Sequence, residues 1–368
     1  MSGSNTGILF RLSSFGESHG PAVGGVVDGC PPGISLCEAD LQQALDRRRP
    51  GQSSVSTSRN EVDKVEILSG VFEGKSTGTP IAFLIRNKDQ RSEDYKELAE
   101  VYRPSHADLV YEQKYGIRDH RGGGRSSARE TAVRVAAGAI AAAMLSKLGI
   151  EIVAWVIQAG EIRLPDSLAY SVYTQTDTDA FVVRCPVAEY ASRMENLITG
   201  LKASGDSCGG VVHCMVRGLH AGVGEPVYEK LNARIGAAML SINACKGIEF
   251  GSGFRAANMK GSAHNDAYKI KDGNIQTQSN HAGGIQGGIS NGNEIRFDVA
   301  FKPPSTISVA QNTVNKQGQE LILKAVGRHD PCVVPRAVPV VEAMCALVLA
   351  DLVLIQGSRL WFRQQINH

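Results

Sequence analysis

The sequence lacks the segments that would direct a 368-residue chain into or through a membrane. It begins Met-Ser-Gly-Ser-Asn-Thr, without the basic and apolar stretches of a secretory signal. The apolar run 132–148 is rich in alanine, contains Arg134 and Lys147, and is too short to span a bilayer. A net charge of only +2 excludes a global nucleic-acid footprint. We therefore expect a cytoplasmic protein without a membrane or nucleic-acid partner, whose arginine clusters bind a small anion.

The usual patterns for metals, disulfides and nucleotides are also missing. The eight cysteines contain no C-x-x-C pair, so we expect reduced thiols and no metal site. No G-x-x-x-x-G-K-[ST] sequence is present, which excludes an ordinary P-loop. Residues 251–256, GSGFRA, match the dinucleotide pattern G-x-G-x-x-A, but no helical pattern follows them. Any nucleotide-like cofactor must therefore be bound by another kind of site.

Glycine, by contrast, is abundant, with 40 residues, and a triple glycine lies in 118–134, RDHRGGGRSSARETAVR. Glycine lets the backbone approach a ligand closely and adopt positive φ. Ser127-Ala-Arg-Glu130 fits a capping box, which predicts that a helix begins there with Arg134 on the face of Glu130. Helix N-termini and arginines both favour anions. We predict an anion site at the start of a buried helix; a solvated loop is the alternative.

Hydrophobic patterning predicts strands, helices and polar or glycine-rich loops in alternation. The strands are expected at 7–14, 22–27, 65–68, 80–86, 151–158, 211–216 and 294–301. The helices are expected at 36–49, 132–148, 187–203, 228–241 and 339–356, the last with Pro339 in its first turn. Long loops are expected at 52–60, 87–102, 164–179 and 247–288.

A weak internal repeat suggests a duplicated architecture. The segment GVFEGKSTGTPIAFLI, residues 70–85, matches GIQGGISNGNEIRFDV, residues 284–299, at six of sixteen positions. Both are followed by a loop and a long apolar helix. We expect one domain over 1–368, with two β–α–β–loop–α halves at 7–150 and 205–356 related by a pseudo-twofold axis, and a tail at 357–368.

The motif Gly16-Glu-Ser-His-Gly20 allows two interpretations. It matches the G-x-S-x-G elbow of serine hydrolases, which requires a strand before it and a helix directly after it. Here Pro21 and a β-type segment follow, which speaks against Ser18 as a nucleophile. His19 on a rigid turn suits a proton donor near pH 7. A serine hydrolase and a non-catalytic phosphate-binding protein remain the alternatives to a phosphate-handling enzyme.

Eight motifs occur in order along the chain: G-E-S-H-G-P, D-G-x-P-P-G, R-R-R-P-G-Q, S-G-V-F-E-G-x-x-T-G-T-P, R-P-S-H-A-D, G-I-R-D-x-R-G-G-G-R-S-S-A-R-E-T, S-N-H-A-G-G-I-Q-G-G-I-S-N-G and G-R-H-D-P-C-V-x-x-R-A-V-P. Together they resemble the chorismate synthase family over residues 5–355. The resemblance implies an α+β fold, a β-α-β sandwich with helices packed between antiparallel sheets, in a homotetramer. It also implies an anti-1,4-elimination that converts 5-enolpyruvylshikimate 3-phosphate to chorismate and phosphate.

The same resemblance implies a dependence on reduced FMN without net redox change. NADPH would enter only indirectly or as flavin reductant, and we expect external reduction. The implied catalytic residues are His19, which would protonate the departing phosphate, His106, beside the flavin pyrimidine, and Asp330, near flavin N5, where it helps the flavin take the C6 proton. The implied FMN-binding residues are Arg125, Ser126, Ser127, Asn243, Ala244, Gly287, Lys302, Pro303, Pro304, Ser305, Thr306 and Arg328. The implied substrate-binding or NADP-binding residues are Arg48, Arg49, Arg134 and Arg336.

The chain departs from the family pattern at two positions. Many members carry another arginine three residues after R-R-R-P-G, where this chain has Ser54; Arg59 is the nearest substitute in the same loop. Pro304 stands where threonine is common, which removes one hydroxyl and the backbone donor. A main-chain acceptor contact at this position would survive the change.

Overall fold

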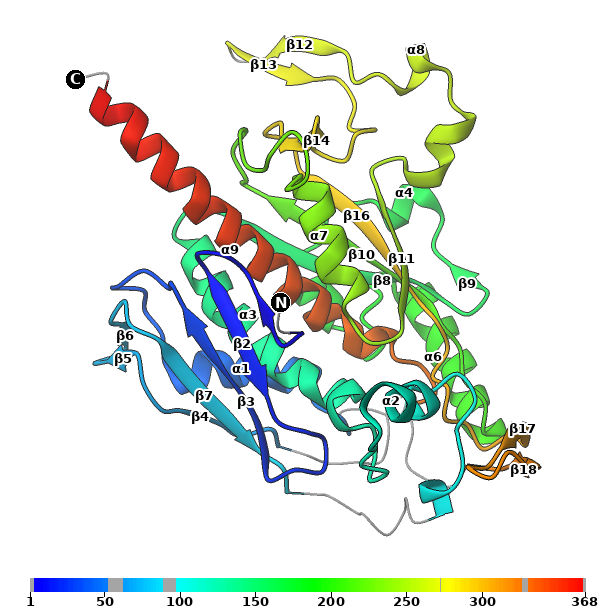
Figure 1. Ribbon diagram of the computed structural model, residues 1–368. Helices are drawn as coiled ribbons and strands as arrows, with labels where there is room; N and C mark the ends of the chain where they lie inside the picture. The colour runs from blue at the N-terminus through cyan, green and yellow to red at the C-terminus, as the bar shows by residue number, and fades with distance from the viewer. Residues whose placement is uncertain (1–2, 52–61, 89–96, 272, 326–329, 367–368) are drawn as a thin grey trace.

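The computed structural model of the chain describes residues 3–51, 62–88, 97–271, 273–325 and 330–366. It has an α+β architecture in which two five-stranded antiparallel sheets enclose a layer of helices (Figure 1). The expected fold class, helices between antiparallel sheets, is therefore what the structure has.

The first sheet is built from the N-terminal part of the chain, in the order β1-β2-β3-β7-β4. These strands are β1 Asn5–Thr6, β2 Arg11–Phe15, β3 Ala22–Asp28, β4 Val65–Ile67 and β7 Ile81–Arg86. A small hairpin, β5 Val71–Phe72 and β6 Lys75–Ser76, precedes β7. The inner face of β3 and β7 is apolar because Val23, Val27, Ile81, Phe83 and Ile85 are buried.

The second sheet has the order β11-β16-β10-β8-β9. Its strands are β8 Glu151–Ala159, β9 Ile162–Arg163, β10 Gly210–Arg217, β11 Cys245–Phe250 and β16 Ile295–Phe301. Without the edge strands β1 and β9, the first sheet follows β2-β3-β7-β4 and the second β8-β10-β16-β11. Numbered in chain order, these four strands lie in the order first-second-fourth-third in both sheets, although β8 precedes the second half expected at 205–356.

Four helices lie between the sheets: α1 Glu38–Arg48, α3 Thr131–Ser146, α7 Leu231–Leu240 and α9 Val334–Ile366. Helices α3 and α9 cross at Gly138, where an added Cβ atom would lie only 2.3 Å from Cβ of Ala343. Glycine costs about 1 kcal/mol relative to alanine inside a helix. At this crossing it allows the two apolar helices to pack backbone to backbone.

The start of α9 differs from the expectation, because Pro339 lies inside the helix and not in its first turn. Proline has no N–H to donate to the carbonyl four residues earlier. That carbonyl, of Pro335, accepts a hydrogen bond from the buried Arg184 guanidinium at 2.6 Å. The helix can therefore begin earlier because a side chain from a distant segment replaces the missing donor.

Helix α9 also continues through most of the expected tail, ending at Ile366 (Figure 1). It is long and apolar enough to cross a membrane, but 83% of its most apolar stretch is buried inside the protein. No other helix of the described ranges has that length and composition. Its apolar character is thus explained by its place in the core.

The expected strand at 7–14 begins only at Arg11. Gly7 turns the chain with φ of +86°, and the carboxylate of Asp351 on α9 accepts the backbone N–H groups of Ile8, Leu9 and Phe10 at 2.6 to 3.0 Å. The side chain of Asp351 has no exposed surface. A buried acceptor thus takes the place of a strand partner for these three residues.

Several expected loops contain regular structure. The 247–288 segment contains η5 Gly253–Asn258, α8 Gly261–His264, β12 Tyr268–Lys271, β13 Asn274–Thr277 and β14 Ile285–Gln286, which pairs with β15 Ile289–Ser290. The 164–179 segment contains α4 Asp166–Ala169 and α5 Gln175–Asp179. The expected helix at 187–203 is α6 Ala188–Ser204. The expected loop at 52–60 lies outside the described residues.

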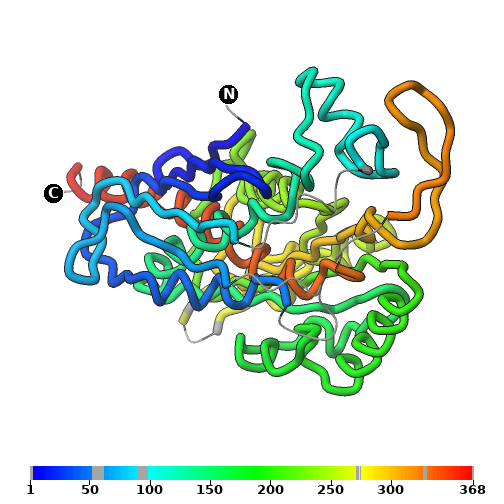
Figure 2. The backbone as a smooth tube through the Cα atoms, turned by 90° about the horizontal axis from the view of Figure 1, so that it is seen from below, coloured from blue at the N-terminus to red at the C-terminus, as the bar shows by residue number. Residues whose placement is uncertain are grey.

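Two further elements lie together at one end of the molecule. Residues 97–116, with η2 Glu97–Ala99 and α2 Asp108–Tyr115, contact the hairpin β17 Gln311–Val314 and β18 Glu320–Leu323 (Figure 2). Helix α2 was not expected from the sequence. All eight cysteines have free thiols, and the described residues contain no cluster of metal-binding side chains.

Candidate active site

The triple-glycine loop lies directly against the 16–20 turn. Gly122 has φ of +85°, and a Cβ atom added there would lie 2.6 Å from the ring of His19 and 2.9 Å from Ser18 Oγ. The N–H of Ser18 bonds the carbonyl of Gly124 at 3.4 Å. Only glycine meets both the backbone angle and the space at position 122. The loop therefore forms the wall against which the 6% exposed His19 rests.

The 16–20 turn does not have the geometry of a hydrolase elbow. Strand β3, and not a helix, follows Pro21, whereas the elbow requires a strand-to-helix turn. Ser18 Oγ lies 3.1 Å from Nδ1 of the adjacent His19. The two side chains form a local polar pair against the glycine loop.

The second histidine, His106, is held by an aspartate at the start of α2. Its Nδ1 lies 2.9 Å from Oδ1 of Asp108. Arg103 donates from Nε and Nη2 to the same carboxylate at 2.8 Å each, and from Nη2 to the carbonyl of Gly122 at 2.9 Å. Burial would raise the pKa of Asp108, but hydrogen bonds from Arg103 and His106 outweigh it and hold this pKa well below its usual range.

The 302–306 segment reaches the residue before His106. Lys302 Nζ donates to Oγ of Ser105 at 3.1 Å, and Ser305 Oγ donates to the Ser105 carbonyl at 2.9 Å. Burial, and then the charge of Lys246, lower the pKa of Lys302. The N–H of Lys302 bonds the carbonyl of Ala244 at 2.9 Å. This segment therefore joins the 105–106 turn to the 243–244 turn.

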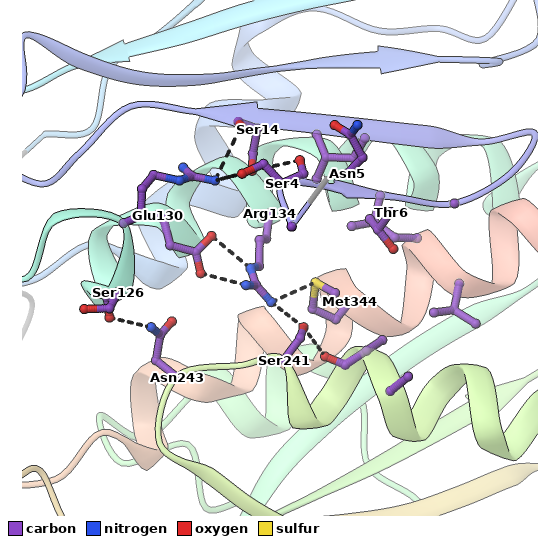
Figure 3. A pocket seen from close by; sticks show the side chains of 18 of the residues that line it. Ser4, Asn5, Thr6, Ser14, Ser126, Glu130, Arg134, Ser241, Asn243 and Met344 are labelled. Carbon is purple, nitrogen blue, oxygen red and sulfur yellow. Dashed lines mark hydrogen bonds and ion pairs between the residues drawn. The ribbon is translucent and has the colours of Figure 1, made fainter. Parts of the chain in front are cut away.

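The 243–244 turn also contacts Ser126, which lies between the triple glycine and α3 (Figure 3). Asn243 Nδ2 donates to the carbonyl of Ser126 at 2.8 Å. No described residue provides a hydrogen-bond partner for the buried Oδ1 of Asn243. Arg125 reaches the end of β2, where it bonds Ser14 Oγ at 2.7 Å and the Gly16 carbonyl at 3.1 Å. Residues 125, 126, 243, 244, 302 and 305 thus form one continuous series of contacts ending beside His106.

A helix begins near the predicted position, but neither hydrogen bond of the predicted capping box between Ser127 and Glu130 is present. Ser127 Oγ caps a 3-10 turn, η4 Ala128–Glu130, by accepting from the N–H of Arg129, and α3 follows at Thr131. Glu130 does not return to Ser127. Its carboxylate is bonded instead by Arg134, with Nε at 3.0 Å (Figure 3). The guanidinium of Arg134 also donates to Ser241 Oγ at 2.7 Å.

Two adjoining cavities share Arg125 and Ser126. The larger, of about 620 Å³, is lined by Arg134, Asn243 and the N-terminal residues 3–7 among others. The smaller, of about 440 Å³, is lined by His106 and the triple glycine. Volumes of 300–1,000 Å³ suit small-molecule and cofactor sites.

A second group of predicted residues lies at the start of α9. Arg336 forms an ion pair with Asp330, and its Nε donates to the carbonyl of Arg48 at 3.1 Å. Arg48 is buried and pairs with Asp63 at 2.8 Å, and Arg129 pairs with the same carboxylate. This cluster unites the three predicted residues 48, 330 and 336 with a carboxylate that the sequence interpretation missed.

Some predicted residues are not brought into these groups. The carbonyl of Gly288, next to Gly287, accepts the N–H of Leu231 at the first turn of α7, whereas Asn243 follows the last turn of this helix. The ten residues of α7 span about 15 Å. Within one chain, Gly287 and Asn243 therefore lie at opposite ends of this helix. Arg49, the partly buried residue that follows α1, lies 3.4 Å from Asp46. The carbonyl of Pro304 accepts a hydrogen bond from Ser207 Oγ at 2.9 Å. Arg328, Ser54 and Arg59 lie outside the described residues.

Arg103 and Asp108 were missed as site residues. Both belong to the motif R-P-S-H-A-D, so their spacing around His106 was the available signal. Asp63 had no comparable signal, because it follows a polar loop in sequence and approaches Arg48 only in the folded chain.

Histidines and arginines around adjoining cavities of this size are typical of an enzyme that acts on anionic small molecules. A chorismate synthase family model matches residues 10–354. A chorismate synthase of Parabacteroides distasonis is 56% identical over 353 residues, covering 96% of this chain and 98% of the relative. One of Bacteroides fragilis is 56% identical over 352 residues, covering 95% and 97%. A solved structure titled "Crystal Structure of Chorismate Synthase" matches with a TM-score of 0.76 and 31% identity, covering 95% of this chain and 93% of that one.

The chain belongs to the chorismate synthase family. It is a carbon–oxygen lyase of the shikimate pathway to the aromatic amino acids, which converts 5-enolpyruvylshikimate 3-phosphate to chorismate and phosphate and depends on reduced FMN.

The residues around the two cavities fit such a cofactor. A flavin nucleotide needs cations and hydroxyls for its phosphate and polar partners for its ring edge. Arg125 and Ser126, which line both cavities, and Lys302 and Ser305, which contact Ser105, are available for the phosphate. The buried Asn243 Oδ1, which has no partner among the described residues, is available to accept a hydrogen bond from a ligand N–H.

Proposed function

We propose that the elimination takes place beside the triple-glycine loop, where the two cavities adjoin, with His106 lining the smaller cavity and His19 lying behind Gly122. The observation that carries this proposal is the series of contacts from Arg125 through Asn243, Ala244 and Lys302 to Ser105, next to His106. It unites segments that are far apart in sequence. Within one chain, Gly287 stands outside this set, so we propose FMN binding by residues 125–127, 243–244 and 302–306, with Arg328 as a further ligand.

The proposed roles of the chain's own groups follow from their surroundings. His19, enclosed by the glycine loop, holds the proton that neutralises the departing phosphate. His106 holds a proton beside the flavin ring, where Nδ1 is tied to Asp108. Asp330, paired with Arg336 at the start of α9, accepts a proton. When bound, reduced FMN supplies electron density to the substrate while the C–O bond breaks.

Arg48, Arg49, Arg134 and Arg336 are the proposed ligands for the phosphate and the two carboxylates of the substrate. Arg134 lines the larger cavity and is oriented by Glu130 and Ser241. Arg48 and Arg336 approach each other through the Arg48 carbonyl. Preorganised cations in a cavity that excludes water bind anions more strongly than the same groups in solvent.

We further propose that the chain is one domain that arose by duplication. The matched strand orders of the two sheets, each followed by a long central helix, support a pseudo-twofold axis near the α3–α9 crossing. We also propose a cytoplasmic homotetramer that receives reduced flavin from outside, with NADPH acting only through a separate reductant.

An anaerobic assay tests the assignment. The chain is supplied with FMN and 5-enolpyruvylshikimate 3-phosphate, with and without dithionite, and chorismate is measured. We expect product only with reductant, and turnover of the oxidised enzyme would contradict flavin dependence. His106→Ala should reduce turnover by at least ~10²-fold, the usual scale for a lost proton-transfer group, with an unchanged unfolding temperature. Near-normal activity would reject the role of His106.

A further inference from the structure

We propose that Asp108 is a positioning residue that fixes the ring of His106 and keeps a proton on its Nδ1, so that Nε2 is the nitrogen presented to ligands. The proposal deepens the role given to His106 and rests on it for its functional meaning. It names a residue that acts through His106 and that the family motifs did not assign, although Asp108 also lines the 440 Å³ cavity.

The carboxylate of Asp108 is held on several sides. Its side chain is 3% exposed. Oδ2 accepts the backbone N–H of Arg103 at 3.1 Å and Nε of Arg103 at 2.8 Å, while Oδ1 accepts Nη2 of Arg103 and faces His106 Nδ1. The Arg118 guanidinium forms a further ion pair with it at 3.0 Å. Rotation of the carboxylate would break several of these bonds at once, so its direction is defined without His106.

Charge then determines which imidazole nitrogen carries hydrogen. Two guanidinium groups flank Asp108 and keep it ionised, and an ionised carboxylate can only accept hydrogen bonds. Nδ1 of His106 must therefore be the donor in the 2.9 Å contact. In a neutral imidazole the other nitrogen, Nε2, then has the lone pair, and in the cation it has the second proton. His106 lines the 440 Å³ cavity with a side chain that is 21% exposed.

The contacts of Asp108 and its partner Arg103 also extend to the loop beside His19. Arg103 Nη2 donates to the carbonyl of Gly122 at 2.9 Å, and Gly122 is the residue that leaves no room for a Cβ beside His19. Asp108 and Arg103 thus hold His106 directly and the wall behind His19 indirectly. A change at Asp108 should consequently disturb the alignment of two groups that act on one substrate.

The molecule contains a natural control. In the second sheet, Nδ1 of His213 on β10 lies 2.5 Å from Oδ1 of Asp298 on β16. This pair is buried against Trp155 and Tyr170 and belongs to neither cavity. Asp298→Asn therefore removes a buried His–Asp contact of the same kind away from the proposed site.

Nitrogen-15 NMR of histidine-labelled full-length chain without FMN tests the proposal, because the two ring nitrogens report the tautomer. His106 and His213 signals are assigned with His106→Gln and His213→Gln. In the unmodified chain, neutral His106 should be the Nδ1–H form. Asp108→Asn should shift His106 toward the Nε2–H form and leave His213 unchanged, and Asp298→Asn should do the reverse. An Nε2–H form of His106 in the unmodified chain would overturn the proposal, even if Asp108→Asn failed to fold.

Turnover separates this proposal from the role of His106. A misdirected imidazole should lose part of the ~10²-fold contribution of a positioned proton-transfer group, so Asp108→Asn should lower kcat at least ~10-fold with little change in KM. Asp298→Asn should retain kcat while lowering the unfolding temperature.

If His106→Ala stays active while the tautomer of His106 is as expected, the proposed catalytic role of His106 fails, but the positioning of its ring by Asp108 stands. If Asp108→Asn changes the tautomer but not kcat, the functional part of the positioning proposal is rejected.

Discussion

Two cavities flank the α3–α9 crossing, and they differ in how their arginines are paired. In the cavity on the α7 side, Arg134 pairs with Glu130, and Arg234 pairs with Glu229 and Asp351, but Arg125 has no such partner in the described part of the chain. On the α7 side, Arg125 bonds only neutral oxygen atoms among the described residues, in the cavity of about 620 Å³. On the α1 side, a cavity of about 270 Å³ contains Arg47, which pairs with Asp179 and Glu342. Burial would lower the pKa of Arg47, but the two carboxylates outweigh it and raise this pKa.

Two similar sheets that share their central helices therefore do not create two similar binding sites. Both cavities lie beside the same pair of central helices, each with a third helix, α7 or α1, as the other wall. An anion entering the α7 side meets positive charge that no carboxylate has neutralised at Arg125. An anion entering the α1 side would have to displace two carboxylates. The loops and ion pairs around each cavity, and not the layers of sheets and helices, determine this difference in the pairing of the arginines.

Gly122→Ala should produce the largest effect on the α7 side. Its Cβ would meet His19 and Ser18 at 2.6 to 2.9 Å, at a backbone angle that alanine disfavours. A displacement of about 1 Å in a catalytic group can cost ~10²-fold in rate, so kcat should fall by at least that factor. Gly124→Ala is the control. The φ of Gly124 is also positive, at +52°, but a Cβ atom added there would have no atom within 4 Å other than those of its chain neighbours. Gly124→Ala should lower the unfolding free energy by only about 1 kcal/mol. If Gly122→Ala and Gly124→Ala lowered kcat equally, the contact with His19 would not be the cause of the loss.

Arg134→Ala and Arg47→Ala test the two cavities directly. Loss of a charge-assisted bond of about 1.5–3 kcal/mol should raise KM for substrate by ~10- to 100-fold in Arg134→Ala, with a smaller loss of FMN affinity. Arg47→Ala should leave both affinities unchanged, but should lower the unfolding free energy by about 1.5–3 kcal/mol because Glu342 and Asp179 lose a partly buried partner. Equal losses of substrate and FMN binding in Arg134→Ala would indicate a structural role. Weaker substrate binding in Arg47→Ala would erase the contrast.

The smallest expected effect is on acid stability. The pKa of Asp108 is lower in the folded chain than the value of about 3.9 in an unfolded chain. Its ionised form therefore stabilises the fold fully above about pH 4, and this contribution disappears as the pH falls further toward the folded pKa. The difference in unfolding temperature between the unmodified chain and Asp108→Asn should be constant from pH 7 to 5 and shrink below pH 4. A difference that grows on acidification would contradict the lowered pKa.

Local patterns predicted much of the framework because they depend on neighbours in sequence. The strand at 22–27 and the helix at 36–49 were confirmed within about two residues, since alternation and capping are short-range signals. The i, i+4 contact of Glu130 and Arg134 was also predictable. By contrast, α2 and the β12–β13 hairpin were missed because their short polar sequences resemble loops.

Eight ordered motifs in the sequence were enough to identify the family. The sequence also predicted an anion site at the cluster of glycines and arginines before α3. Only the tertiary structure decided which partners those residues meet. Gly122 is required because His19, from another sheet region, packs against it, and Pro339 is tolerated inside α9 because Arg184 bonds the carbonyl it leaves. Such contacts join residues separated by a hundred positions or more, and no local pattern encodes a distance that exists only after the two sheets close on their helices.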